Sequence, residues 1–186
     1  MSGWLADERS TLAAQRILDA AAELFAQQGV AETQMADIAE AAGCSRATLY
    51  RYFENRQAVR LAFVHREARR LGAAVAAEVG GIADPGERVV AAVLAAVRAV
   101  RADPLLIAWF RPADAGVAVE IGQSSAVIEG LTAAFLPEEL GTREDRTRWA
   151  RWLTRLIVSL LTVPGVDDSD ERAMLEQFLA PLFVSR

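Results

Sequence analysis

Residues 44–53 read CSRATLYRYF and gather several hydrogen-bonding side chains on one short segment. On a helical wheel one side is apolar and aromatic, formed by Leu49, Tyr52 and Phe53. The other side carries guanidinium groups, a phenol and one small residue, namely Arg46, Ala47, Tyr50 and Arg51. Arginine forks onto the guanine edge, hydroxyls bond phosphate oxygens, and a small residue allows close approach to a groove. The segment therefore predicts a helix that anchors itself with aromatic rings and presents a surface suited to nucleic acid.

The distribution of charge supports this interpretation, although the whole chain is acidic. Residues 1–44 hold two arginines and seven acids, and residues 71–186 hold eleven arginines and sixteen acids, so each part carries −5. Residues 45–70 hold seven arginines and two acids, which gives +5. A single basic island on an acidic chain is the pattern expected of a local nucleic-acid contact.

Two short helices must position this surface. Thr33 is predicted to cap the first, and Ser45 is predicted to cap the second, which continues to Phe53. Gly43 permits the left-handed backbone that a tight turn between them requires. Two short helices joined by a glycine turn, the second with exposed arginines, indicate a helix-turn-helix unit.

The remainder of the chain is also predicted to be helical. Caps and apolar periodicity indicate helices over about 14–28, 33–42, 45–53, 55–79, 85–101, 105–110, 117–135, 143–163 and 170–183. No stretch shows the period-two alternation of a strand, and Met1–Ser10 is expected to be disordered or loosely packed. The prediction is an all-α protein of about nine helices, with a helix-turn-helix domain at 1–56 and a second helical domain at 57–186.

Several classes of function are disfavoured by composition. The lone cysteine, Cys44, excludes an intrachain disulfide, and no signal-peptide or membrane-length apolar run occurs, so we expect a cytoplasmic protein. With one histidine, His65, no metal site or cofactor is predicted. An enzyme would have only scattered carboxylates for its chemistry, so we expect no catalytic residues.

A family resemblance becomes specific over residues 12–60. The stretch ILDAAAELFAQQGVAETQMADIAEAAGCSRATLYRYFENRQAV contains A-x-x-L-F-x-x-x-G, a threonine before D-I-A, A-G-x-S, L-Y-x-Y-F and N-R in continuous spacing. It resembles the N-terminal domain of the TetR family of one-component transcriptional regulators. Beyond residue 60 only the length and the helical layout are similar to that family.

The resemblance implies roles for individual residues. Phosphate contacts are implied for Thr33, Ser45, Tyr50 and Arg56. Contacts with base edges are implied for Arg46, Ala47, Thr48 and Arg51. Cys44 stands where an aliphatic residue is usual, and Arg56 stands where lysine is common, a change that keeps the charge.

The second domain offers candidate residues for a ligand pocket and for a subunit interface. Large aromatic residues among many alanines and valines could line an apolar cavity, formed by Phe63, Trp109, Phe110, Phe135, Trp149 and Trp152. Core packing explains the same residues without a ligand and is the favoured account of any single one of them. The last two helices are apolar on more than one face and should be buried on more than one. The candidate interface comprises Leu156, Leu160, Leu175, Phe178, Leu179 and Leu182. The resemblance implies a homodimer formed by these helices.

These observations favour a DNA-binding repressor that is released from a palindromic operator by a small, largely apolar effector. A regulator without a small ligand, controlled by a protein partner or by abundance, remains the alternative. A cavity in the second domain would separate the two hypotheses.

Overall fold

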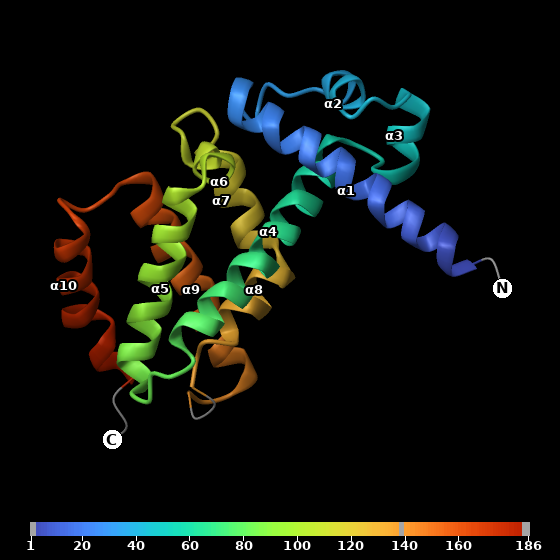
Figure 1. Ribbon diagram of the computed structural model, residues 1–186. Coiled ribbons are helices and arrows are strands. Elements are labelled where there is room, and N and C mark those ends of the chain that lie inside the picture. The colour runs from blue at the N-terminus through green and yellow to red at the C-terminus, as the bar shows by residue number, and fades with distance from the viewer. Residues whose placement is uncertain (1–2, 138–139, 184–186) are drawn as a thin grey trace. The chain divides into compact units, whose positions relative to one another are not determined.

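The computed structural model describes residues 3–137 and 140–183, and every regular element within these ranges is helical (Figure 1). They form ten α-helices and two short 3-10 helices, without a strand. The all-α prediction is confirmed, with ten helices in place of about nine. None of the helices in these ranges is long and apolar enough to cross a membrane.

The helical bounds follow the chain in order. They are α1 Gly3–Gln28, α2 Met35–Ala41, α3 Arg46–Tyr52, α4 Arg56–Val79, α5 Pro85–Ala102, α6 Pro104–Ile107, η1 Ala108–Phe110, α7 Ala115–Ser124, α8 Ala126–Ala133, α9 Arg143–Thr162, α10 Asp168–Phe178 and η2 Ala180–Phe183.

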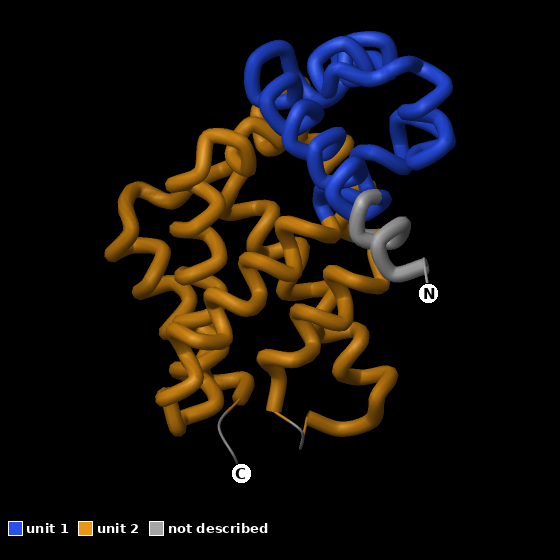
Figure 2. The backbone as a smooth tube through the Cα atoms, turned by 45° about the vertical axis from the view of Figure 1, so that its right-hand side comes forward, with its two compact units in different colours: residues 1–64 blue, residues 65–186 orange. Residues whose placement is uncertain are grey.

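The chain divides into two compact units, residues 1–64 and 65–186, and the division falls inside α4 (Figure 2). The first turns of α4 belong to the N-terminal unit because their side chains pack there. The Phe63 ring meets the Phe25 ring edge to face with centroids 5.8 Å apart, and Arg60 donates to the Val30 carbonyl. The sequence places the boundary earlier, after residue 56, because it shows where α4 begins but not where its side chains pack.

The first helix is longer than its apolar pattern indicates. It begins at Gly3, so the backbone of residues 3–10 is helical where disorder or loose packing was the expectation. No proline or glycine interrupts the chain between Gly3 and Gln28, so helix propensity alone favours extension. Gly29 ends the helix with a φ of 96°, as the glycine at this position predicts.

The core of the C-terminal unit is built around α5, which packs against both α9 and α10 (Figure 1). Asp84 caps α5 by accepting a hydrogen bond from the Glu87 N–H at 2.7 Å, and Pro85 occupies its first turn, as predicted. The buried cluster joins the three helices through Val93, Val97, Leu153, Leu160, Leu175 and Leu179.

The helix predicted over 117–135 is broken at Ser125, which ends α7 and caps α8. The Ser125 hydroxyl accepts a hydrogen bond from the Ile128 N–H at 3.2 Å, and its oxygen lies 2.8 Å from Nε2 of His65 on α4. Burial lowers the pKa of the His65 imidazole, and nearby Arg69 lowers it further, and both effects favour the neutral ring. The break is therefore tied to α4 by a side chain sixty residues away.

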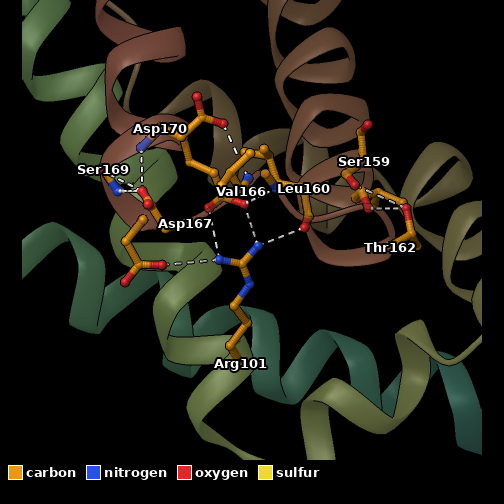
Figure 3. A network of polar contacts seen from close by, with 12 residues as sticks. Arg101, Ser159, Leu160, Thr162, Val166, Asp167, Ser169 and Asp170 are labelled. Atoms are coloured by element: carbon orange, nitrogen blue, oxygen red, sulfur yellow. Dashed lines mark hydrogen bonds and ion pairs between the residues drawn. The ribbon is translucent and has the colours of Figure 1, made fainter.

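A charged pair fastens the start of α10 to the end of α5 (Figure 3). The Arg101 guanidinium donates to both Glu171 carboxylate oxygens, at 2.7 and 2.9 Å, and to the Leu160 carbonyl at 2.9 Å. The Gly165 N–H donates to the same carboxylate at 2.8 Å, and the Glu171 side chain is only 2% exposed. The hydrogen bonds from Arg101 hold the pKa of the Glu171 carboxyl below its usual range. Three segments, α5, α9 and α10, thus meet at one ion pair, because Leu160 of α9 and Glu171 of α10 both accept from Arg101 of α5.

Candidate nucleic-acid interface

The turn between α2 and α3 fixes how α3 begins. Gly43 takes a φ of 64°, and the Cys44 N–H donates to the Ala39 carbonyl at 3.0 Å. The Ser45 hydroxyl then accepts a hydrogen bond from the Thr48 N–H at 3.1 Å, which confirms Ser45 as the N-cap of α3. The Thr48 hydroxyl lies 2.9 Å from that of Ser45, so the two form one hydroxyl pair at the helix start.

The two sides of α3 separate as the helical wheel predicts. Leu49 is fully buried and Phe53, which follows the helix, is 9% exposed. The opposite side is open to solvent and consists of Arg46, Ala47, Tyr50 and Arg51, with Tyr50 half exposed. The apolar side thus anchors the helix, and the polar side is available to a partner.

The two arginines of this exposed side keep their charge uncompensated. Neither Arg46 nor Arg51 forms an ion pair with a carboxylate in the described part of the chain. The Arg51 guanidinium lies over the Tyr52 ring, 5.2 Å from its centroid, which restrains the side chain without neutralising it. A short helix with two free guanidinium groups and a phenol is chemically suited to phosphate oxygens and to the guanine edge.

Thr33 is placed differently from the prediction. It is completely buried, and its hydroxyl donates to the Gly29 carbonyl at 2.7 Å. Gln34 instead stands at the N-cap position of α2, where its N–H donates to the Asp37 carboxylate at 3.0 Å. The helix cap is therefore corrected from Thr33 to Gln34. A buried hydroxyl is also withdrawn from any phosphate, so Thr33 stabilises the turn after α1.

Arg56 is half-buried and bound to the backbone of the same turn. Its Nη1 donates to the carbonyl oxygens of Ala31 at 2.8 Å and Thr33 at 3.4 Å. Arg60, one helical turn later, is 7% exposed and also donates to the Ala31 carbonyl, at 3.3 Å. Sequence reasoning missed Arg60. The only sequence feature that points to Arg60 is its spacing of four residues from Arg56 at the start of α4.

The six aromatic residues proposed for a pocket are divided among several packing environments, although the Trp149 and Trp152 rings touch, with centroids 5.6 Å apart. Phe63 lies in the N-terminal unit against Phe25. In the C-terminal unit Trp109 is buried, and Phe110 and Trp149 pack on the main core cluster. Phe135 packs on a second cluster, and Trp152 is 43% exposed.

A hollow of about 280 Å³ does exist, but between α7 and α9. Its walls include Val119 and Gly122 of α7 and Arg155, Val158 and Ser159 of α9. None of the six aromatic residues lines this hollow. Within the described residues no group of three histidine, cysteine or acidic side chains is arranged to hold a metal ion.

The residues proposed for a subunit interface divide into two sets. Leu160, Leu175 and Leu179 are buried within the core of the C-terminal unit, and Leu156 is half-buried against it. Phe178 and Leu182 are exposed, at 66% and 50%. The three buried leucines pack in the protomer core, so Phe178 and Leu182 are the members of the candidate interface that leave large apolar surface open to a second copy.

Other exposed apolar residues were not proposed and lie on or beside the same helices. Met174 is exposed on α10, in line with Phe178, and Trp152 is exposed on α9. Val163 and Val166, in the turn between these helices, are 72% and 90% exposed. So much exposed apolar surface near the C-terminus is typical of a surface that meets a partner.

Comparison with known proteins extends the resemblance over nearly the whole chain. A family model described as "Bacterial regulatory proteins, tetR family" matches residues 17–63. The chain is 47% identical over 181 residues to the HTH-type transcriptional regulator MT1294 of Mycobacterium tuberculosis (strain CDC 1551 / Oshkosh), covering 96% of this chain and 89% of that protein. It is 31% identical over 170 residues to the HTH-type transcriptional repressor KstR of Rhodococcus jostii (strain RHA1), covering 87% and 79%.

A solved structure shows the same fold. Thermus thermophilus FadR, a TetR-family transcriptional repressor crystallised in complex with lauroyl-CoA, matches with a TM-score of 0.62 and 24% identity. The match covers 93% of this chain and 96% of that chain.

Proposed function

Because the chain belongs to the TetR family of bacterial transcriptional regulators, we propose that it binds a palindromic operator as a homodimer and leaves it when a small, largely apolar effector binds. As a member of this family the chain is a DNA-binding regulator and not an enzyme. One of its relatives is a repressor. The operator symmetry, the dimer and the effector are the proposed parts.

The observation that carries DNA recognition is the exposed side of α3. We assign base-edge contacts to Arg46, Ala47, Thr48 and Arg51 because they lie on or beside this side at the start of a major-groove helix. Ser45 and Tyr50 are assigned to phosphates because hydroxyl groups at a helix start suit that contact.

Thr33 and Arg56 act indirectly in this proposal. Both are held by backbone carbonyl groups of the turn between α1 and α2, as described above. They keep that turn in place, and the turn leads directly into α2. The charge of Arg56 still adds to the local positive potential, since a guanidinium remains ionised when it is hydrogen-bonded.

The homodimer is supported by the apolar residues that the protomer leaves uncovered. Trp152, Phe178 and Leu182 are each at least 43% exposed, and together with the turn valines they flank α9 and α10. A two-fold dimer would cover this surface and would also present two copies of α3, which is why a palindrome is expected.

The effector is supported by the hollow in the C-terminal unit and by the connection to α4. His65 joins α4 to the junction of α7 and α8 through Ser125, and α4 continues into the N-terminal unit at its other end. A ligand that shifts α7 would therefore act on the helix that leads to α3. That FadR was solved with lauroyl-CoA supports the expectation that this fold can hold a ligand.

DNA recognition can be tested by selecting an operator from random duplexes and measuring affinity for the selected and a scrambled site. Arg46→Ala should weaken binding to the selected operator by about 1–3 kcal/mol per half-site and relax the preference at one base position. Arg172→Ala is the matched control, since Arg172 is an exposed arginine of α10. Equal losses on both duplexes would reassign Arg46 to the DNA backbone. No loss on either would remove α3 from the interface.

A further inference from the structure

In the hollow between α7 and α9, the buried and half-buried lining residues are called the floor here and the exposed ones the rim. Val119 and Val158 supply apolar walls, and Gly122 brings α7 close to α9 because a Cβ there would lie 3.5 Å from the Thr154 side chain. The Thr154 hydroxyl donates to the Ala150 carbonyl at 2.9 Å, so its proton is used within α9. The floor therefore offers little to a polar ligand.

The rim is different, because two of its polar side chains have no partner. The Arg155 guanidinium and the Ser159 hydroxyl are exposed, lie one helical turn apart on α9 and form no hydrogen bond or ion pair with another residue that the structure describes. Together they offer a guanidinium fork and a hydroxyl donor at the edge of an apolar hollow. Groups of this kind complement an anionic oxygen.

Neighbouring arginines on the same helix show that Arg155 is unusual. Arg148 bonds Asp145 at 3.0 Å, and Arg151 bonds Glu129 of α8 at 2.7 Å. Carboxylates neutralise these two guanidinium groups. Arg155 has no carboxylate partner within the described ranges, although the net charge of the chain is −5. An arginine of α9 without a carboxylate partner in the described ranges thus stands at the hollow.

We propose that this hollow binds a small amphiphile with one anionic head group, held by Arg155 and Ser159, with its apolar body against Val119 and Val158. A volume of about 280 Å³ is near the lower limit of ligand sites, roughly 300 Å³, so the apolar body is short. The inference rests on the proposed function, because it gives the site and the chemical class of the effector.

The test uses the full-length protein without DNA and three probes of equal chain length: octanoate, octyl phosphate and 1-octanol. Calorimetric titration should show that at least one anionic probe binds about tenfold or more tightly than the alcohol, the value of one charge-assisted hydrogen bond. Arg155→Gln should remove this advantage and leave octanol binding unchanged. Arg148→Gln is the matched control on the same helix and should change nothing.

A second variant tests the hollow itself. Gly122→Ala adds a methyl group to its floor at an ordinary contact distance, so the protein should fold and bind every probe more weakly. Equal affinity for octanol and both anions, unchanged anion affinity in Arg155→Gln, or no saturable binding of any probe would each overturn the proposal. Operator release is measured separately. If an anion binds through Arg155 but the protein stays on the DNA, the site is supported and the effector role is excluded.

Discussion

Replacing Glu171 by alanine should destabilise the C-terminal unit by about 3–5 kcal/mol, the usual cost of breaking a buried ion pair from one side. The carboxylate is 2% exposed and accepts three hydrogen bonds, two from Arg101 and one from the Gly165 N–H. Its removal leaves the guanidinium with the Leu160 carbonyl and the exposed Asp168 carboxylate, 3.6 Å away. The Gly165 N–H would lose its acceptor as well.

Calorimetric melting measures this loss directly. For a protein of this size 1 kcal/mol corresponds to roughly 2–4 °C, so Tm should fall by roughly 6–20 °C. Glu176→Ala is the control on the same helix, because its pairing with Arg172 is exposed and should contribute less than about 1 kcal/mol. If both variants lose the same amount, the pair does not fasten α10. Combining Glu171→Leu with Arg101→Met should restore most of the stability, because it leaves no unpaired charge.

The same pair predicts a pH dependence. The folded pKa of Glu171 is lowered, so its contribution is complete above the unfolded value, about 4.3, and is lost as pH falls through the folded value. The difference in unfolding free energy between the wild type and Glu171→Ala should therefore be constant near neutrality and shrink below about pH 4. A difference that grows on acidification would contradict the assignment.

Two further predictions concern packing. Phe178→Glu should give folded monomers in sedimentation because Phe178 is exposed. Leu179→Glu should unfold the protomer because Leu179 is only 1% exposed and the new charge would be buried. A folded dimer in both variants would place the interface elsewhere. Gly86→Ala should lower Tm because the new Cβ would lie 2.7 Å from the Ala180 carbonyl oxygen. In Gly130→Ala the new Cβ meets no atom within 4 Å, so this variant should raise Tm slightly. An equal fall in Tm for the two glycine variants would refute the close approach of Gly86 to Ala180.

Features encoded by neighbouring residues could be predicted from the sequence. Ser45 and Asp84 cap their helices through hydrogen bonds three residues along the chain, and Gly43 takes the positive φ that its turn requires. The amphipathic separation of α3 is likewise a local property, since the period of a helix fixes which side chains share a side. The candidate DNA surface on α3 could therefore be predicted from the ten residues 44–53 alone.

Features that depend on distant partners could not be predicted. Periodicity shows that α10 has two apolar stripes, but only packing on α5 decides that Leu179 is buried and Phe178 exposed. A serine within a helical pattern fits either a continuous helix or a cap, and the break at Ser125 involves His65 on α4. Arg56 has the charge of a phosphate contact, yet its Nη1 donates to the carbonyl groups of Ala31 and Thr33, twenty-five and twenty-three residues earlier.

Recognition of DNA through α3 is tested most directly by the salt dependence of binding to the selected operator. Each phosphate neutralised by a cationic side chain contributes about −0.9 to the slope of log affinity against log salt. A guanidinium that reaches a base edge lies between the two phosphate strands of the groove and displaces condensed cations there as well. Arg46 and Arg51 from two protomers supply four such groups, so we expect a slope of roughly −2 to −4, and a shallower one for Arg51→Ala. A slope near zero, or one that Arg51→Ala leaves unchanged, would contradict contact between the exposed side of α3 and DNA.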